Sequence, residues 1–165
     1  LLFTETRYDT TDLIPEEVGG NRYGWFTFIN VGGGIAIDEH QLVVPLDPIG
    51  KATFGFVSKY KKGADVPTGN TEFVFNAADL KFHSTTYQWL IVTGSDYAKF
   101  KGSGLINGLQ APNSQDYKFQ LWAGDSEPDT FRIKIWWEDG AIEHVVYDNG
   151  MDQPIGSGSI VIHTK

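Results

Sequence analysis

Phe131-Arg-Ile-Lys-Ile-Trp-Trp137 is the stretch that decides the fold of this chain. Its apolar residues recur at every second position and basic residues fall between them, as in a β-strand with one buried face. Asp139-Gly140 follows and favours a tight type I′ turn, because glycine adopts the left-handed backbone that this turn needs. The next stretch, Ile142-Glu-His-Val-Val-Tyr-Asp148, returns with a similar β-prone composition. Together they predict an antiparallel β-protein.

Strand-like runs bounded by Gly, Pro, Asn or Asp continue along the chain from Arg22. The expected strands are 22–31, 33–37, 41–45, 51–60, 71–76, 79–84, 87–93, 97–107, 116–123, 130–137, 142–148 and 157–163. About a dozen short strands with little or no helix predict an all-β fold, a two-sheet antiparallel sandwich that is jelly-roll or immunoglobulin-like. Residues 1–20 are expected to form an N-terminal segment and residues 21–165 a single domain.

Composition argues against several kinds of site and partner. The chain has 165 residues, a formal net charge of −8 and no cysteine, so disulfides and thiolate metal sites are excluded. An acidic chain is a poor partner for nucleic acid, because phosphates require a surplus of Lys and Arg on one face. No apolar run approaches the roughly 20 residues that span a bilayer, so no membrane span is expected. Because the chain begins with Leu1 and not Met, we expect a mature or trimmed N-terminus, compatible with export.

Closely spaced glycines occur three times, as Gly32-Gly-Gly34, Gly102-Ser-Gly104 and Gly156-Ser-Gly158. None precedes a helix start, so a phosphate-binding loop is not expected. The spacing instead favours β-bulges or close backbone approach between sheets.

Several motifs in register resemble a known β-domain. They are Val31-Gly-Gly-Gly-Ile35, Gly50-Lys-Ala-Thr-Phe-Gly-Phe-Val-Ser-Lys-Tyr-Lys-Lys-Gly63, Phe82-His-Ser-Thr-Thr-Tyr87, Ala98-Lys-Phe-Lys-Gly-Ser-Gly104, Asp129-Thr-Phe-Arg-Ile-Lys-Ile-Trp136, Val146-Tyr-Asp-Asn149 and Pro154-Ile-Gly-Ser-Gly-Ser-Ile-Val-Ile-His163. Over residues 28–163 the chain resembles the post-COAP-type domain found toward the C-termini of large secreted bacterial and archaeal surface proteins. The resemblance implies an extracellular or cell-surface, non-catalytic accessory module and brings no catalytic residues with it.

Catalytic patterns are weak in this sequence. The four histidines are far apart in the sequence and lack metal-ligand spacing; they are His40, His83, His144 and His163. No serine lies in a GxSxG elbow. Pairing through Asp139-Gly140 places His144 opposite Ile135 on the inward face, where we expect its imidazole to be part of the core. A pair of acidic residues across a cleft is not excluded by sequence, but short strands and loops offer no cleft. We expect no enzyme.

A calcium site is one candidate. The expected register places Phe131 opposite Asp148, which brings the loop 124–130 beside the segment 148–152. Five carboxylates would then gather at one end of the sandwich, from Asp125, Glu127, Asp129, Asp148 and Asp152. Calcium binds six to eight such oxygens, although Asp and Asn also serve as ordinary turn residues.

Aromatic residues suggest a glycan site. If 116–123 and 130–137 form a hairpin, Trp122 lies near Arg132 and Lys118 near Trp136 on the outward face, with Gln120 and Lys134 between them. An exposed tryptophan pair among polar donors could bind a polysaccharide by stacking against sugar rings. The alternatives are that both indoles are covered, or that they form ordinary cation–π contacts.

The N-terminus is the last candidate. Its apolar, β-prone residues could pair within their own sheet or complete the sheet of a neighbouring copy; they include Leu1, Leu2, Phe3 and Tyr8. A head-to-tail contact of the second kind would build a filament. The leading hypothesis is therefore an extracellular structural or adhesive subunit that assembles with itself by donor-strand exchange. The alternative is a carbohydrate-binding accessory module, with calcium as a possible stabilising ion in either.

Overall fold

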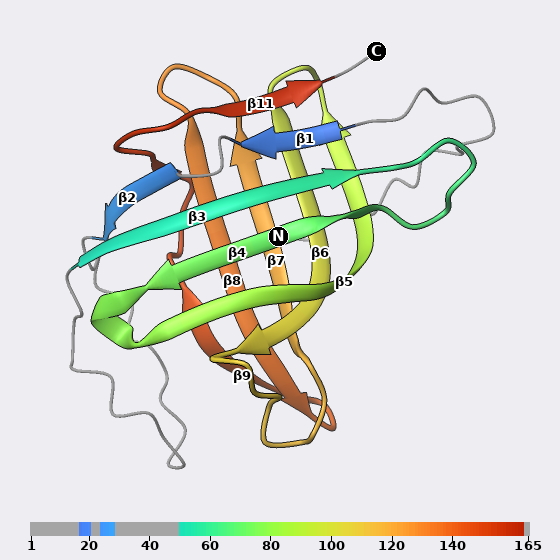
Figure 1. The fold of residues 1–165 in the computed structure, drawn as a ribbon, viewed down its shortest axis with the longest axis vertical. Coiled ribbons are helices and arrows are strands. Elements are labelled where there is room, and N and C mark those ends of the chain that lie inside the picture. The colour runs from blue at the N-terminus through green and yellow to red at the C-terminus, as the bar shows by residue number, and fades with distance from the viewer. Residues whose placement is uncertain (1–16, 21–23, 29–49, 164–165) are drawn as a thin grey trace.

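The computed structural model describes residues 17–20, 24–28 and 50–163. Within these ranges the chain forms eleven strands and one short 3₁₀ turn (Figure 1). The elements are β1 (Glu17–Gly20), β2 (Gly24–Phe28), β3 (Gly50–Lys59), β4 (Thr68–Phe75), η1 (Asn76–Ala78), β5 (Leu80–Thr93), β6 (Tyr97–Ile106), β7 (Tyr117–Gly124), β8 (Thr130–Asp139), β9 (Ile142–Asp148), β10 (Gln153–Pro154) and β11 (Ile160–His163). The prediction of an all-β chain with little helix is confirmed for this part of the molecule.

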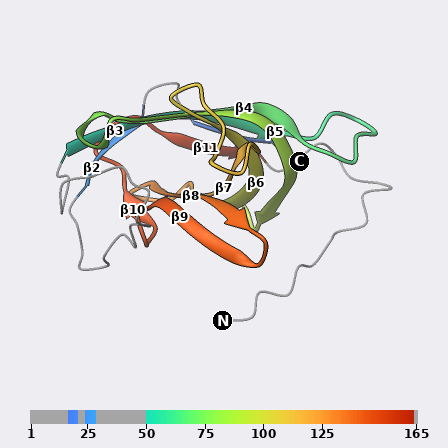
Figure 2. The ribbon, with the colours of Figure 1, turned by 90° about the horizontal axis from the view of Figure 1, so that it is seen from below.

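All eleven strands belong to one antiparallel sheet. Its order is β10-β8-β7-β6-β5-β4-β3-β1-β11, with β2 also paired to β3 and β9 also paired to β8. Figure 2 shows that this sheet is strongly curled, so that β3 and β4 lie over β8 and the long strands β5 and β6 pass round one side. The strands thus form a half-barrel, and the expected division into two separate sheets is not confirmed.

The sheet turns its corner where β5 and β6 pair. β5 has irregular register between Ser84 and Thr86 and again between Tyr87 and Trp89. Opposite these irregularities β6 carries Gly102 and Gly104, which are buried. A Cβ at Gly102 would lie 2.1 Å from the carbonyl oxygen of Thr86, so only glycine fits against the bent partner strand. The predicted bulge at this glycine pair is confirmed, and the close backbone approach is to the neighbouring strand β5 and not between two sheets.

Aromatic side chains fill the interior of the curl. The alternating inward residues of β3, β4, β6, β7 and β8 are buried, including Phe54, Phe73, Phe100, Phe119 and Phe131. The rings of Phe54 on β3 and Phe131 on β8 stack with centroids 3.9 Å apart, which joins two strands that are far apart in the order of the sheet. Burying a ring of this size stabilises the fold by roughly 1.5–3 kcal/mol.

The β8–β9 hairpin forms as expected, but its register differs. Asp139 pairs with Ile142, so the two turn residues are Gly140 and Ala141, and Gly140 adopts a φ of 59°. A register shift also falls between Ile135 and Trp136. His144 therefore lies opposite Trp137 and not Ile135, and the expectation of a core imidazole was wrong, because the side chain is only half-buried.

Among the residues that the structure describes, no helix has the length and apolar character needed to cross a membrane.

Candidate functional site

The outward surface of strands β5 to β8 carries alternating indole rings and cations. We call it the tryptophan–lysine face and define it by Trp89, Lys99, Lys101, Lys118, Gln120, Trp122, Arg132, Lys134 and Trp136. These residues share one side of the sheet because each lies between two buried, inward residues of its strand or pairs across the sheet with a residue of the same side. Register then arranges them in rows: Lys101, Gln120 and Lys134 lie side by side across three strands.

The predicted β7–β8 register is confirmed. Trp122 pairs with Arg132, Lys118 pairs with Trp136, and Gln120 and Lys134 pair between them. The sequence missed Trp89, which pairs with Lys101 from the β5 side. The irregular β5 register hides this pairing, because a bulge moves Trp89 out of simple alternation with Tyr87.

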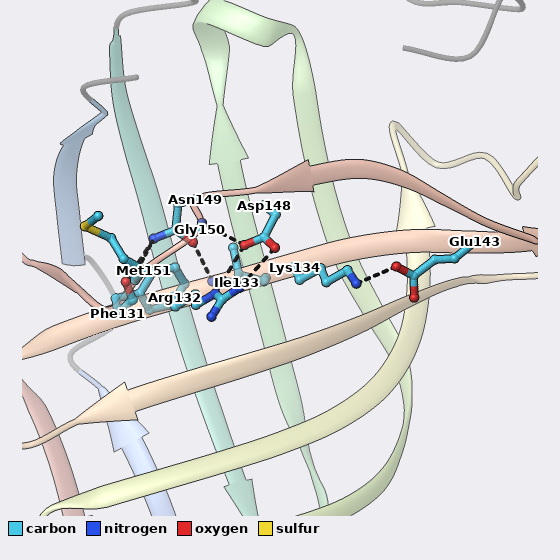
Figure 3. Close-up of polar contacts among 9 residues, drawn as sticks. All are labelled: Phe131, Arg132, Ile133, Lys134, Glu143, Asp148, Asn149, Gly150 and Met151. Carbon is cyan, nitrogen blue, oxygen red and sulfur yellow. Dashed lines mark hydrogen bonds and ion pairs between the residues drawn. The ribbon is translucent and has the colours of Figure 1, made fainter. Parts of the chain in front are cut away.

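Arg132 is held from two sides. Its guanidinium carbon lies 4.5 Å from the centre of the Trp122 ring. Its Nε and Nη2 donate to the two carboxylate oxygens of Asp148, at 3.2 Å and 3.1 Å (Figure 3). Such a two-point contact fixes the plane of the guanidinium, so Arg132 and the half-buried Trp122 form a preorganised pair.

Trp136 differs from the exposed indole that the sequence suggested. Only 5% of the residue is exposed, so the expectation of exposure was wrong for this member of the pair. The Nζ atoms of Lys101 and Lys134 lie 5.3 Å and 5.1 Å from its ring centre, and its Nε1 donates to Glu138 at 3.1 Å. Trp136 therefore supports the face from below, while Trp122 and Trp89 remain half-buried at its surface.

Glu138 links Trp136 to Lys118. Lys118 Nζ donates to its Oε2 while the Trp136 indole donates to its Oε1. These hydrogen bonds, first from Lys118 and then from Trp136, lower the pKa of the Glu138 carboxyl below its ordinary value.

The outward residues of β6 to β9 carry a local positive surplus. Five of them are cations and three are carboxylates, whereas the whole chain carries −8. The cations are Lys99, Lys101, Lys118, Arg132 and Lys134, and the carboxylates are Glu138, Glu143 and Asp148. Each of these carboxylates accepts a hydrogen bond from one of the cations. Two of the cations, Lys99 and Lys101, lie on β6.

The expected calcium cluster is not formed. Among the described residues no three of the side chains that bind metals come together. The register explains the error, because Phe131 pairs with Gln153 while Asp148 pairs with Lys134. Glu127 is exposed on its loop, next to Pro128.

Two of the predicted calcium ligands instead seal an edge of the sheet. Asp129 accepts the backbone N–H of Ile160 at 2.6 Å, and Asp125 accepts that of Ile162 at 2.9 Å. These N–H groups belong to β11, the last strand of the sheet. The carboxylates thereby take the place of a further strand along this edge. Asp152 is also engaged, because it accepts the Tyr97 hydroxyl at 2.9 Å and burial together with this contact raises the pKa of Tyr97.

Asn149 was not predicted as a key residue. It follows β9 and is buried, and its Oδ1 accepts the Ile133 N–H at 2.8 Å. Its Nδ2 donates to the carbonyl oxygens of Phe131 and Met151, at 3.0 Å and 3.1 Å (Figure 3). The amide therefore fills the gap between β9 and β10 along β8. An asparagine before Gly150 is an ordinary turn signal, so the sequence did not reveal this role.

The described histidines do not assemble into a site. The His144 ring stacks on Trp137 with centroids 4.1 Å apart, and His83 lies 3.6 Å from Glu72 at the surface. His163 is exposed at the end of β11, and His40 lies outside the described residues.

A buried polar cluster lies between β3, β4 and β5. Thr71 and Tyr87 share a hydrogen bond of 2.6 Å, and the Thr71 N–H donates to Ser84 at 2.8 Å. Burial raises the pKa of Tyr87, which keeps its hydroxyl protonated and able to donate. These contacts satisfy polar groups in the core, which is a structural role.

The candidate assembly residues Leu1, Leu2, Phe3 and Tyr8 lie outside the described residues. Comparisons with known proteins found no matching family model, curated protein or solved structure.

Proposed function

We propose that this chain is an extracellular, non-catalytic adhesive module that binds polysaccharide through the tryptophan–lysine face. The observation that carries the proposal is the surface row formed by Trp122 and its cross-strand neighbours. The half-buried indole lies beside Arg132, and Gln120 lies two residues before it on the same strand. An aromatic ring offers an apolar surface to a sugar ring, while the flanking groups can hydrogen-bond to its hydroxyls.

A rigid surface of this kind suits binding better than catalysis. The three carboxylates nearest the indoles are each bonded to a cation, as described for Glu138, Glu143 and Asp148. For Glu138 the hydrogen bonds from Lys118 and Trp136 also lower the pKa of the carboxyl, which makes it a weaker proton acceptor. The same contacts hold the cations in place and reduce the entropy lost on binding a polymer.

A glycan array tests this proposal. The native chain should give a signal that Trp122→Ala removes, because this change takes away the stacking surface. Trp137→Ala is the matched control, since Trp137 pairs with His144 away from the face; it should retain the signal. Circular dichroism and the unfolding midpoint establish that both variants are folded. An array with no signal for the native chain would contradict the proposal.

Self-assembly is a second proposal, supported by the position of β9. In the described part of the chain β9 pairs with β8 alone, so its other edge is available to an added strand. The apolar residues 1–8 of a second copy are the proposed donor, in a surface filament built from jelly-roll or immunoglobulin-like subunits. Deleting residues 1–9 should leave a monomer in sedimentation analysis. Unchanged assembly of the truncated chain would contradict donor-strand exchange.

A further inference from the structure

We infer that the polysaccharide bound by the tryptophan–lysine face is acidic, a polymer whose sugar rings carry carboxylates. This inference rests on the proposed function and names its ligand class. It follows from where the positive charges lie relative to the indoles, which neutral sugars would not require.

Four of the cations form two rows, one on either side of β7. Lys99 and Lys101 are outward residues of β6, and Arg132 and Lys134 are outward residues of β8. Strands β6 and β8 both pair with β7, so the two rows lie about 10 Å apart. Within each row the cations are two residues apart, which corresponds to about 7 Å.

The strip between the rows is aromatic and neutral over most of its length. On β7, Gln120 and Trp122 face outward between the cations. A chain of sugar rings lying along β7 would contact Trp122, while its carboxylates reach Lys99 and Lys101 on one side and Arg132 on the other. Carboxylates repeated along a polymer match two rows of cations, because each pair gains charge-assisted hydrogen bonds.

The charges are also positioned by the indoles. Lys99 Nζ lies 5.9 Å from the Trp89 ring centre, and Lys101 Nζ lies 5.3 Å from that of Trp136. Lys134 and Arg132 have side chains only 23% and 28% exposed. Long side chains held against the sheet in this way lose less rotamer freedom when they bind an anion.

The same combination of rings and cations also occurs in proteins that bind single-stranded nucleic acid. The arrangement of the rings favours a polysaccharide. Successive bases of a single strand stack on successive aromatic side chains, whereas the outward side of β7 presents one indole, that of Trp122.

The test uses calorimetric titration with two matched ligands, oligogalacturonate and the same oligomer with its carboxylates methyl-esterified. The acidic form should bind at least about tenfold more tightly, because only it can pair with the cations. The double variant Lys99→Gln with Lys101→Gln should weaken its binding by roughly tenfold. Lys51→Gln with Lys81→Gln removes the same charge from exposed positions on β3 and β5 and should change binding less than about twofold.

Each other outcome overturns the inference in a distinguishable way. Equal binding of both oligomers would overturn the acidic ligand class but leave polysaccharide binding intact. Failure of both to bind, together with an empty glycan array, would overturn the proposed function as well. Tighter binding of oligothymidylate than of oligogalacturonate would assign the face to nucleic acid. An equal loss in both lysine variants would show that overall charge, and not this face, controls binding.

Discussion

Arg132 lies over Trp122, with the guanidinium carbon 4.5 Å from the ring centre, while Asp148 holds the same guanidinium through two hydrogen bonds. The pair joins neighbouring strands β7 and β8, and Asp148 extends the contact to β9. An interaction of this kind contributes about 0.5–1 kcal/mol at a surface. The contact also fixes the shape of the tryptophan–lysine face on its β8 side before a ligand binds.

Asn149→Ala should destabilise the fold by about 1–3 kcal/mol, because the N–H of Ile133 and the carbonyl of Phe131 lose their partner. Chemical denaturation measures the loss, and hydrogen exchange at Ile133 should accelerate. Asn70→Ala is a control at an exposed strand position and should stay within about 0.5 kcal/mol of the native chain. An equal effect of the two changes would refute the bridging role.

Gly102→Ala should destabilise the fold by about 1–3 kcal/mol, because the new Cβ would lie 2.1 Å from the Thr86 carbonyl oxygen. Ser103→Ala, one residue along, removes only an exposed hydrogen bond of 2.7 Å to Thr86 and should cost less than about 1 kcal/mol. The free energy of unfolding distinguishes the two. If Gly102→Ala were neutral, the corner of the sheet would not depend on close backbone approach.

Glu138 should make a small, pH-dependent contribution to stability. Hydrogen bonds from Lys118 and Trp136 lower its pKa in the folded chain, so the contribution is present above the unfolded pKa and is lost as pH falls through the folded pKa. Glu138→Gln should therefore lower the free energy of unfolding at pH 7 and have less effect in acid.

Trp136→Phe supplies an independent check, because it removes the indole donor and should raise the pKa of Glu138 toward its ordinary value. Carboxyl carbon NMR measures this pKa directly. If the pKa of Glu138 were the same in Trp136→Phe as in the native chain, the indole hydrogen bond would not be a cause of the lowered pKa.

Removing calcium with excess EDTA should leave the melting temperature unchanged. The carboxylates of Asp125 and Asp129 accept backbone N–H groups of β11, and Asp148 is bonded to Arg132. They are therefore engaged without a metal. A melting temperature that falls with EDTA and recovers with calcium would contradict this assignment, since a bound ion stabilises the folded state.

The sequence predicts well which neighbouring strands pair, but it predicts poorly how the sheet curls. Alternation in 116–123 and 130–137 was enough to place Trp122 beside Arg132, because a short hairpin fixes its own register. The turn lies at Gly140-Ala141 and not at Asp139-Gly140, which misplaced His144, and the bulge between Ile135 and Trp136 moved Asp148 by one further residue. A bulge inserts one residue without a strong composition signal, so alternation alone cannot locate it.

Burial and sheet closure depend on contacts distant in sequence. Trp136 looked exposed because it alternates with inward residues, yet Lys101 from β6 and Lys134 cover it. Likewise the division into two sheets could not be read from strand count, because long bent strands can carry one sheet round a corner. The hydrogen bond from the Ile160 N–H of β11 to Asp129 forms only after that curling.

Chemical-shift mapping with an acidic oligosaccharide tests the central claim most directly. Titrating oligogalacturonate into the isotope-labelled chain should shift the indole N–H of Trp122 and the amides of Lys99 to Lys101 and of Arg132, on β6 to β8. Amides on the exposed surface of β3 and β4 should not move. Shifts confined to β3 and β4, or a spectrum unchanged at saturating ligand, would contradict the assignment of the tryptophan–lysine face as the binding surface.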